Sequence, residues 1–438
     1  MKVAKFGGSS LSCGENFQRV KGIIDSDPSR RVVVVSAPGK RTADDNKVTD
    51  LLYICHAHIR YKVGYDDIWG NICGRYLEIA SACGLSERIK DTLSSVRSSM
   101  TKTSSEDEIV SRGEYLNAFL MAEYLGYDFA DAAEWLFFNY DGTVDYEKTY
   151  AALKELAKVH THLVLPGFYG TMPDGSLHVF SRGGSDVTGA IAAAALTADC
   201  YENWTDVNGI LMADPKIVNN PKLIQRVTFS ELRELSYMGA EVLHEDTVFP
   251  VRQANIPLYI KNTKSPSSEG TLIMESFADE NEEERSRFIT GITGKKHYSI
   301  ITVSKNRMTD DISFIRRVLE ITERYHLPIE HIPSSVDSFS LVIATRSLYR
   351  CVHQLVSDIQ RECSPDSVKV CDGVSLVAVV GRRMQSTKGV SGKIFATLGD
   401  HGINIRLIEQ GSDEINIIIG VMDTDFVPAI RTLYESFT

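Results

Sequence analysis

The sequence predicts an α/β domain with a largely parallel central sheet, followed by two small ferredoxin-like domains. Continuous aliphatic runs at 32–35 and 163–165 are typical of strands that are buried on both faces of a sheet. Longer helical patterns, for example over 50–61 and 111–124, separate such runs, and this alternation favours parallel strands. Towards the C-terminus the order strand-helix-strand-strand-helix occurs twice, which is the ferredoxin-like arrangement.

Residues 262–287 differ from both flanking regions and mark the expected domain boundary. The sequence Ser-Pro-Ser-Ser-Glu-Gly at 265–270 has turn chemistry, and 279–284 is an acidic run that is typical of a solvated segment. We therefore expect the α/β domain at 1–285, the first ferredoxin-like unit at 289–372 and the second at 373–438.

The two C-terminal units differ in the number of strands they supply. In the first, strands are expected at 299–304, 329–332, 339–344 and 368–370, with helices at 311–325 and 348–361. In the second, strands are expected at 375–380, 403–408 and 415–421, with helices at 392–398 and 426–435. The second unit thus lacks a fourth strand. Because proteins usually fill an unpaired sheet position, we expect a strand from elsewhere to complete it, so that the two units interleave.

Bulk composition excludes several classes of protein. The 438 residues include 47 Lys and Arg and 58 Asp and Glu, and the net charge of −11 argues against a nucleic-acid-binding surface. The eight cysteines show no Cys-x-x-Cys spacing, which fits reduced thiols in a cytosol. No apolar run reaches membrane-spanning length, and no signal-peptide pattern is present. We expect a cytoplasmic protein without nucleic-acid or membrane partners.

A glycine pair near the N-terminus is the first candidate for ligand binding. The sequence Lys-Phe-Gly-Gly-Ser-Ser begins at Lys5, where a short strand runs into Gly7, Gly8 and Ser9 ahead of a predicted helix. Glycines let the backbone approach a ligand closely, and the N–H groups of a helix start attract phosphate. Lys5 could contact a phosphate there as a compact positive charge. The alternative is a plain strand-to-helix turn with a solvated lysine.

Further motifs follow in a fixed order along the chain. They are Val-Val-Val-Ser-Ala-Pro-Gly from residue 33, Ser-Arg-Gly-Glu from 111, Arg-Gly-Gly-Ser-Asp from 182, Trp-Thr-Asp-Val-Asn-Gly-Ile from 204 with Asp-Pro at 214, and Met-Gly-Ala-Glu-Val-Leu-His from 238. Together with the N-terminal glycine pair they resemble the aspartokinases of the amino acid kinase superfamily over nearly the whole chain. The resemblance implies a monofunctional enzyme with the amino acid kinase fold and C-terminal tandem ACT domains. It also implies conversion of ATP and L-aspartate, with Mg²⁺, to ADP and 4-phospho-L-aspartate, the first step towards lysine, threonine and methionine.

Phosphoryl transfer to a carboxylate places particular demands on a site. An ordinary carboxyl group has a pKa of about 4, so the nucleophile is already ionised and needs no strong general base. Catalysis then consists of positioning and of neutralising charge on the transferred group. Lys5, with the N–H groups of Gly7 and Gly8, suits the phosphoryl oxygens. The planar guanidinium of Arg182 suits the substrate α-carboxylate, and Glu114 suits its ammonium group.

Two residues near these motifs also have a simple structural explanation that involves no ligand. Glu114 follows Gly113 at what looks like a helix start, where a carboxylate is favourable without any ligand. Thr49 and Asp50 begin another predicted helix, so Thr49 is also a candidate N-cap.

The resemblance assigns further roles by position. It implies catalytic roles for Lys5 and Asp186, substrate binding by Ser36, Thr49, Glu114, Arg182, Gly183 and Ser185, and ATP binding by Lys5, Gly7, Gly8, Ser9, Thr205, Asp206, Leu211 and Lys216. No Cys/His cluster suggests a protein-held metal site.

The sequence departs from the family pattern at two places. Glu241 stands where the family commonly has a lysine near the nucleotide, and the charged loop over 40–48 is longer than usual, which leaves open whether Thr42 or Thr49 contacts substrate.

A loop in the first ferredoxin-like unit is the expected regulatory site. Residues 334–339 offer hydroxyls and one carboxylate opposite the helix start near Met308. The resemblance to tandem ACT domains implies that Met308, Ser335, Asp337 and Ser338 bind a feedback amino acid, lysine or threonine, at an interface between chains of a dimer or tetramer. Without the resemblance a polar hairpin is the simpler interpretation. Two other functions stay open, another kinase of the superfamily such as a glutamate kinase, and a catalytically silent amino-acid sensor.

Overall fold

The computed structural model describes residues 1–181, 183–240, 243, 245–278, 288–311 and 313–438. They form two compact units. The first comprises Met1–Ile210, Gln225–Phe229 and Val242–Phe277, and the second comprises Leu211–Ile224, Ser230–Glu241 and Ala278–Thr438.

The first unit is built on an eight-stranded sheet with the order β3-β4-β2-β1-β7-β9-β10-β8. All neighbouring strands are parallel except β9 and β10, which confirms the predicted, largely parallel sheet. The strands are β1 (Lys2–Phe6), β2 (Arg30–Val35), β3 (Asp128–Phe129), β4 (Leu163–Pro166), β7 (Cys200–Thr205), β8 (Arg226–Thr228), β9 (Leu258–Asn262) and β10 (Thr271–Met274). A separate hairpin consists of β5 (Tyr169–Thr171) and β6 (Leu177–Val179).

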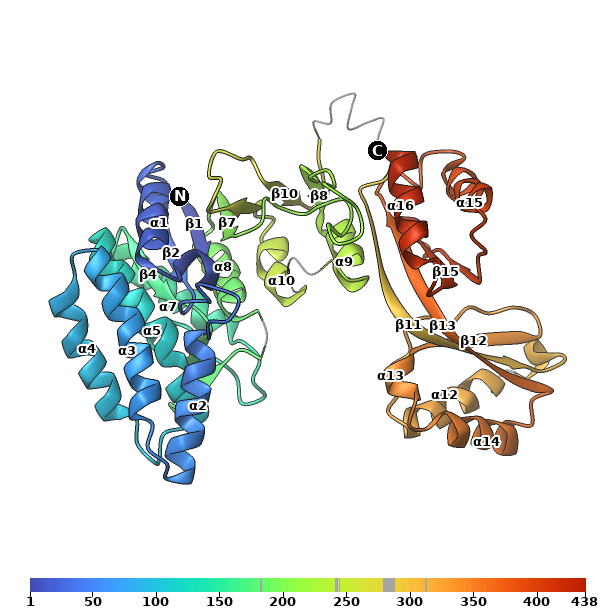
Figure 1. The fold of residues 1–438 in the computed structure, drawn as a ribbon, viewed down its shortest axis with the longest axis horizontal. Coiled ribbons are helices and arrows are strands. Elements are labelled where there is room, and N and C mark those ends of the chain that lie inside the picture. The colour runs from blue at the N-terminus through green and yellow to red at the C-terminus, as the bar shows by residue number, and fades with distance from the viewer. Residues whose placement is uncertain (182, 241–242, 244, 279–287, 312) are drawn as a thin grey trace. The chain divides into compact units, whose positions relative to one another are not determined.

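Helices cover both faces of this sheet (Figure 1). One face packs on α1 (Gly14–Asp25), α2 (Val48–Tyr61), α3 (Asp66–Ala82), α4 (Ser86–Ser99) and α5 (Glu106–Leu125). The other face carries α7 (Tyr146–Val159), α8 (Gly184–Ala195) and α10 (Glu245–Gln253), and α8 contacts β1, β2 and β7. A short helix of this unit is α6 (Ala132–Trp135), whereas α9 (Phe229–Tyr237) belongs, apart from its first residue, to the second unit. Among the described residues, no helix is both long enough and apolar enough to cross a bilayer.

The alternation of side chains along β1 determines which residue faces which helix layer. Ala4 and Phe6 belong to the core shared with α1, α3 and α5. Successive residues of a strand point to opposite faces, so Lys5 points instead to the face that carries α8. A lysine in the middle of a buried sheet is thereby directed towards one particular helix.

The second unit contains a five-stranded antiparallel sheet with the order β12-β11-β13-β15-β14. Its strands are β11 (Gly291–Ser304), β12 (Ser338–Ala344), β13 (Ser367–Val380), β14 (Leu407–Glu409) and β15 (Asn416–Met422). Its helices are α12 (Phe314–Arg324), α13 (Thr345–Leu348), α14 (Val352–Cys363), α15 (Val390–Asp400) and α16 (Phe426–Phe437). Figure 1 shows β11 and β13 running side by side through the whole unit.

Residues 291–295 fill the sheet position that the sequence left open. They are the first half of β11 and pair with 376–380 of β13. The second half of β11 pairs with β12 on one side and with 367–374 of β13 on the other. The strands expected at 368–370 and 375–380 are therefore one strand. The ladder shifts register around His297 and Gly373, which both have positive φ, so the strand bends without ending.

Another expected strand is reduced to a single bridge. The prediction of a strand at 329–332 is wrong, because in this segment only His331 forms a β-bridge, with Val342. The strand expected at 403–408 is short and begins at Leu407.

Candidate active site

The N-terminal glycine turn brings two backbone segments into direct contact. The Gly7 N–H donates to the Trp204 carbonyl (3.1 Å), and the Gly39 N–H donates to the Gly8 carbonyl (2.8 Å). A Cβ atom on Gly8 would lie 2.7 Å from the Ala37 carbonyl oxygen, and one on Gly39 would lie 2.6 Å from the carbonyl carbon of Gly8. Glycine is required at both positions because any side chain would separate the two segments. The expected helix start is a 3-10 turn, Gly8–Leu11, and α1 begins at Gly14.

Lys5 and Asp186, the two residues expected to be catalytic, form a buried ion pair. The Lys5 side chain is 7% exposed, and its Nζ contacts Oδ1 of Asp186, which lies in the first turn of α8. Asn203 completes the group, since its Oδ1 lies 3.4 Å from Lys5 Nζ and its Nδ2 donates to Asp186 Oδ1 (2.9 Å). The solvated-lysine alternative is therefore wrong, because Lys5 lies inside the protein.

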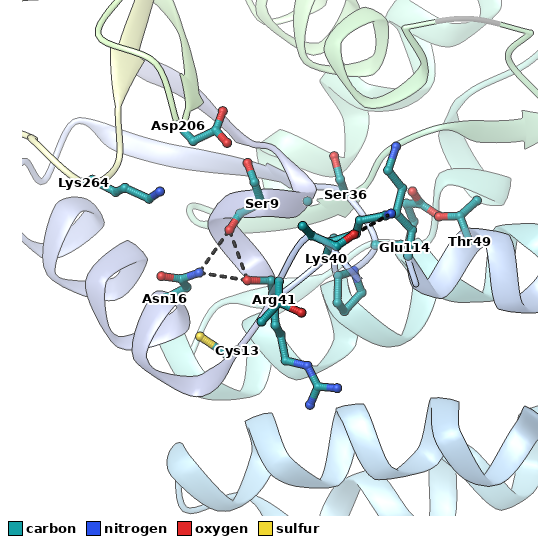
Figure 2. Close-up of a pocket in the computed structure, with 18 residues that line it drawn as sticks. Ser9, Cys13, Asn16, Ser36, Lys40, Arg41, Thr49, Glu114, Asp206 and Lys264 are labelled. Atoms are coloured by element: carbon teal, nitrogen blue, oxygen red, sulfur yellow. Dashed lines mark hydrogen bonds between the residues drawn. The ribbon is translucent and has the colours of Figure 1, made fainter. Parts of the chain in front are cut away.

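A cavity of about 780 Å³ adjoins this turn. Figure 2 shows Asp206 and Lys264 at one end and Thr49 and Glu114 at the other. Its wall consists of Gly8, Ser9, Ser12, Cys13, Asn16, Ser36, Ala37, Pro38, Gly39, Lys40, Arg41, Thr42, Ala43, Lys47, Thr49, Glu114, Asp206 and Lys264. Four of these side chains are cationic and two are anionic, so the wall is electropositive in a chain whose net charge is −11. Such a wall favours anionic ligands.

Glu114 is a buried carboxylate with an unused oxygen. It lies inside α5, two turns from the first residue, Glu106, so the helix-start interpretation is wrong. The residue is 5% exposed, and its Oε2 has no hydrogen-bond partner among the described residues. Burial raises the pKa of Glu114 to about 8, although backbone N–H groups, including that of Ala37, oppose the shift. Ionised Glu114 therefore requires a cationic partner, which the cavity can admit.

Ser36, Thr42 and Thr49 all line the cavity. The Ser36 N–H donates to the Phe6 carbonyl (3.2 Å), and its own carbonyl accepts from Asn117 Nδ2 (2.6 Å). Lys47 occupies the N-cap position of α2, so Thr49 is not the N-cap and its hydroxyl is not committed to that role. Both threonines reach the cavity, and the choice between them stays a prediction.

The other end of the cavity is built from the ends of neighbouring strands. Asp206 follows β7, and Lys264 follows β9. Thr263 ties these segments together, since its Oγ1 donates to the Thr205 carbonyl (3.0 Å) and lies 3.0 Å from Ser10 Oγ. Lys264 Nζ makes no ion pair or hydrogen bond within the part of the chain that the structure describes. Ligands of parallel sheets bind at this edge, beyond the carboxyl ends of the strands.

Some expected site residues lie elsewhere. Gly183, with φ 61°, is the N-cap of α8, and Ser185 is buried beside Gly167; neither lines the cavity. Leu211 and Lys216 belong to the second unit. Arg182 and Glu241 lie outside the described residues.

The expected regulatory residues come together in the second unit. The Arg307 N–H donates to Asp337 Oδ1 and the Lys305 N–H to the Asp337 carbonyl, both at 2.9 Å. The Ser335 N–H donates to the Ser338 carbonyl (2.7 Å), and Met308 is buried at the start of the adjacent 3-10 turn. Asp337 is exposed, so its second oxygen is open to solvent.

Sequence reasoning missed four residues that shape the site. They are Arg75, Asn117, Asn203 and Lys264. Only Asn203 carried a local signal, as a polar residue within the buried strand β7, two residues before Thr205. Arg75 and Asn117 lie in helices, far in sequence from the carbonyls that they contact. Lys264 follows β9, and its ammonium group has no partner among the described residues.

Comparison with known proteins identifies the family. The Amino acid kinase family matches residues 1–262, and the ACT domain matches residues 377–437. Aspartokinase 3 of Bacillus subtilis is 35% identical in an alignment that covers 100% of this chain and 98% of that protein. The chain belongs to the aspartokinases. This result confirms the resemblance seen in the sequence and the class of enzyme, an ATP-dependent kinase.

Solved aspartokinases have the same architecture. Aspartate kinase of Clostridium acetobutylicum superimposes with a TM-score of 0.94 at 46% identity, and the match covers 100% of both chains. Aspartokinase III of Escherichia coli, solved with aspartate and ADP, matches with a TM-score of 0.73 at 25% identity, over 100% of this chain and 99% of that one. The predicted fold, an amino acid kinase domain with C-terminal ACT domains, is confirmed.

Proposed function

We propose that the protein transfers the γ-phosphoryl group of ATP to the β-carboxylate of L-aspartate, giving ADP and 4-phospho-L-aspartate. The unpaired Oε2 of buried Glu114 carries this proposal, because it suits the ammonium group of an amino acid. The nucleotide lies at the opposite end, beside Asp206 and Lys264. The solved complex of Escherichia coli aspartokinase III with aspartate and ADP supports the same pair of ligands.

Between the two ends, the reaction needs charge neutralisation more than it needs a base. Lys5, held by Asp186 and Asn203, is assigned to the transferred group. The N–H group of Gly8 supports it, whereas the Gly7 N–H already donates to the Trp204 carbonyl. Arg182 is assigned to the substrate α-carboxylate, with Ser36 and either Thr42 or Thr49 beside it. Gly183 and Ser185 are also assigned to substrate binding. Ser9, Thr205, Leu211 and Lys216 are assigned to the nucleotide.

Mg²⁺ is the metal that this chemistry requires. The residues present fit it, because Mg²⁺ in kinases is held by one or two carboxylates together with nucleotide phosphates. Asp206 lines the nucleotide end, and Asp186 is partly exposed beside Lys5. Among the described residues, no cluster of three or more His, Cys, Asp or Glu side chains is arranged to hold a metal without such help. When bound, the ion would neutralise charge on the phosphates.

A hydroxamate assay with ATP and either aspartate or glutamate tests the proposal. Hydroxylamine traps an acyl phosphate, so product with aspartate and none with glutamate is the expected result. Product with glutamate alone would assign a different kinase of the superfamily. Product with neither, despite measured amino-acid binding, would leave the chain as a sensor.

We also propose feedback inhibition by lysine through the second unit. The residues assigned to the site are Met308, Ser335, Asp337 and Ser338, with Asp337 near the charged end of the ligand. Relatives support lysine: one is named lysine-sensitive aspartokinase 3 of Escherichia coli, at 27% identity over 99% of this chain and 98% of its own length, and aspartokinase III of that organism was solved with lysine and aspartate. Threonine is the alternative. We further propose that the reaction is the first step of lysine, threonine and methionine synthesis and takes place in the cytoplasm. The expected form of the enzyme is a homodimer or tetramer.

A further inference from the structure

Arg75 is a buried arginine that donates to two points of a loop whose residues 39–43 line the cavity. It lies in α3 and is 4% exposed. Its Nη1 donates to the Gly39 carbonyl (2.8 Å), and its Nη2 donates to Asp45 Oδ2 (2.5 Å). A guanidinium can hold two acceptors at once because its donors form a rigid planar fork. Both acceptors lie in the segment 39–45, which we call the wall loop and which joins β2 to α2.

Few other contacts hold the wall loop in place. Residues 39–43 line the cavity, and most of the loop is exposed. Asp45 also accepts from the Arg41 N–H (2.9 Å) and from Arg41 Nε (3.0 Å), which closes the loop on itself. Arg41 Nη1 reaches Glu78 of α3 (2.7 Å), but that pair is solvent-exposed and contributes little to stability. The buried anchor of the loop is therefore Arg75.

Arg75 is also linked to the glycine turn, through Gly39. Gly39, whose carbonyl Arg75 holds, uses its own N–H to bond the Gly8 carbonyl (2.8 Å). The two glycines touch so closely that neither admits a Cβ atom. A shift of Gly39 would consequently displace Gly8, whose backbone faces the cavity.

A second buried arginine of the first unit provides the contrast. Arg30 is 7% exposed and pairs with Glu202 (Nε to Oε2, 2.7 Å). Both residues belong to strands, β2 and β7, and neither lines the cavity. Arg30 thus connects two strands, whereas both acceptors of Arg75 lie in the irregular wall loop.

We propose that Arg75, through Asp45 and Gly39, is a positioning residue that fixes the wall loop against the glycine turn and so sets the geometry of the ligand cavity. The role extends the proposed kinase function and rests on it where catalysis is concerned. Arg75 touches no reacting atom in this scheme.

The test compares Arg75→Met and Asp45→Asn with the matched control Arg30→Met. Loss of a buried charge partner destabilises in each case, so kinetics are measured below the melting temperature of every variant. We expect kcat/KM for ATP and aspartate to fall on the order of tenfold or more in Arg75→Met, since small displacements in a site are costly, and to stay unchanged in Arg30→Met. Arg75→Lys should give an intermediate loss, because one ammonium cannot hold both acceptors as the fork does.

Trypsin supplies a readout that does not depend on the kinase function. The wall loop contains Lys40 and Arg41, and cleavage there follows the population of the open loop. We expect cleavage after these residues to be about tenfold faster in Arg75→Met than in Arg30→Met. Equal cleavage in the two variants, or kinetic constants that fall equally in both, would overturn the proposal. If the parent enzyme phosphorylates no aspartate, the proposed function is wrong, and the cleavage comparison still decides the role of Arg75.

Discussion

Lys5 and Asn203 are register partners on the adjacent parallel strands β1 and β7, and both side chains bind the same oxygen, Oδ1 of Asp186. The backbone pairing thus sets the distance between the two side chains. An ammonium group held on two sides in a buried position loses little freedom when a phosphoryl group arrives. Asn203 therefore belongs to the machinery that orients Lys5, although no motif marks it.

Substitutions of these residues should distinguish the residue that contacts the transferred phosphoryl group from the residue that only positions it. We expect Lys5→Ala to lower kcat about a hundredfold or more with little change in the aspartate KM, because the contact is strongest in the transition state. Asn203→Leu should lower kcat about tenfold or more, roughly the value of one hydrogen bond to a charged group. Arg182→Ala should chiefly raise the aspartate KM. Steady-state kinetics with each substrate measure all three, and normal turnover in the Lys5 variant would remove that residue from catalysis.

Glu114 should make the ligand-free protein less stable as pH rises. Its pKa is about 8 in the folded protein, against an ordinary value of 4.5. Below pH 4.5 both states are protonated and the group contributes nothing. Between pH 4.5 and 8 the unfolded state releases its proton first, so the free energy of unfolding falls by about 1.4 kcal/mol per pH unit from this group. Urea unfolding at pH 5.5 and 7.5 should show a smaller loss in Glu114→Gln, and an identical loss in both proteins would contradict this account.

The same carboxyl should couple substrate binding to proton release. The ammonium group of aspartate favours ionised Glu114 and lowers its pKa, so a proton leaves when aspartate binds at pH 7. Calorimetry in buffers of different ionisation enthalpy measures the number released, which we expect to be between zero and one. Succinate, which lacks the ammonium group, is the control ligand. Aspartate binding without proton release would remove Glu114 from the ammonium site.

Lys264 should contribute to nucleotide affinity. Its ammonium lies at the Asp206 end of the cavity and is free of partners among the described residues. We expect Lys264→Ala to raise the ATP KM by at most about fivefold, since exposed charges contribute below about 1 kcal/mol, and to leave the aspartate KM unchanged. Lys154→Ala, an exposed lysine of α7, is the control. A change in the aspartate KM instead would place Lys264 at the other substrate.

Asp337 is expected to accept a structural hydrogen bond and to bind lysine, and a pair of substitutions can distinguish these two roles. Its Oδ1 accepts from the Arg307 N–H, and its charge is assigned to lysine. Asp337→Asn keeps an acceptor for that N–H group and removes the charge, so we expect relief of lysine inhibition with normal uninhibited turnover. A ligand inhibits only through its differential affinity for the less active state. Inhibition curves for the parent, Asp337→Asn and Asp337→Ala measure the effect, and unchanged lysine sensitivity in both variants would refute the assignment.

The sequence was sufficient for the family and the fold class, for identifiable physical reasons. Apolar runs such as 32–35 are long enough to show burial on both faces. Two of the paired glycines, Gly8 and Gly183, mark positions where a side chain or an ordinary φ does not fit. The absence of a fourth strand in the second ferredoxin-like unit also followed from counting elements. These features depend on residues that are close together in the chain.

The tertiary structure decided what depends on distant residues. Local pattern placed Glu114 at a helix start, whereas the three-dimensional packing buries it inside α5 and leaves one oxygen without a hydrogen-bond partner among the described residues. Arg75 and Asn203 acquire their roles only when α3 meets the wall loop and β7 meets β1. The sequence by itself determined which chemistry the chain carries, because motifs and burial patterns are local. Which side chains hold that chemistry in place was decided by the fold, because desolvation and hydrogen-bond partners depend on every segment that packs around a site.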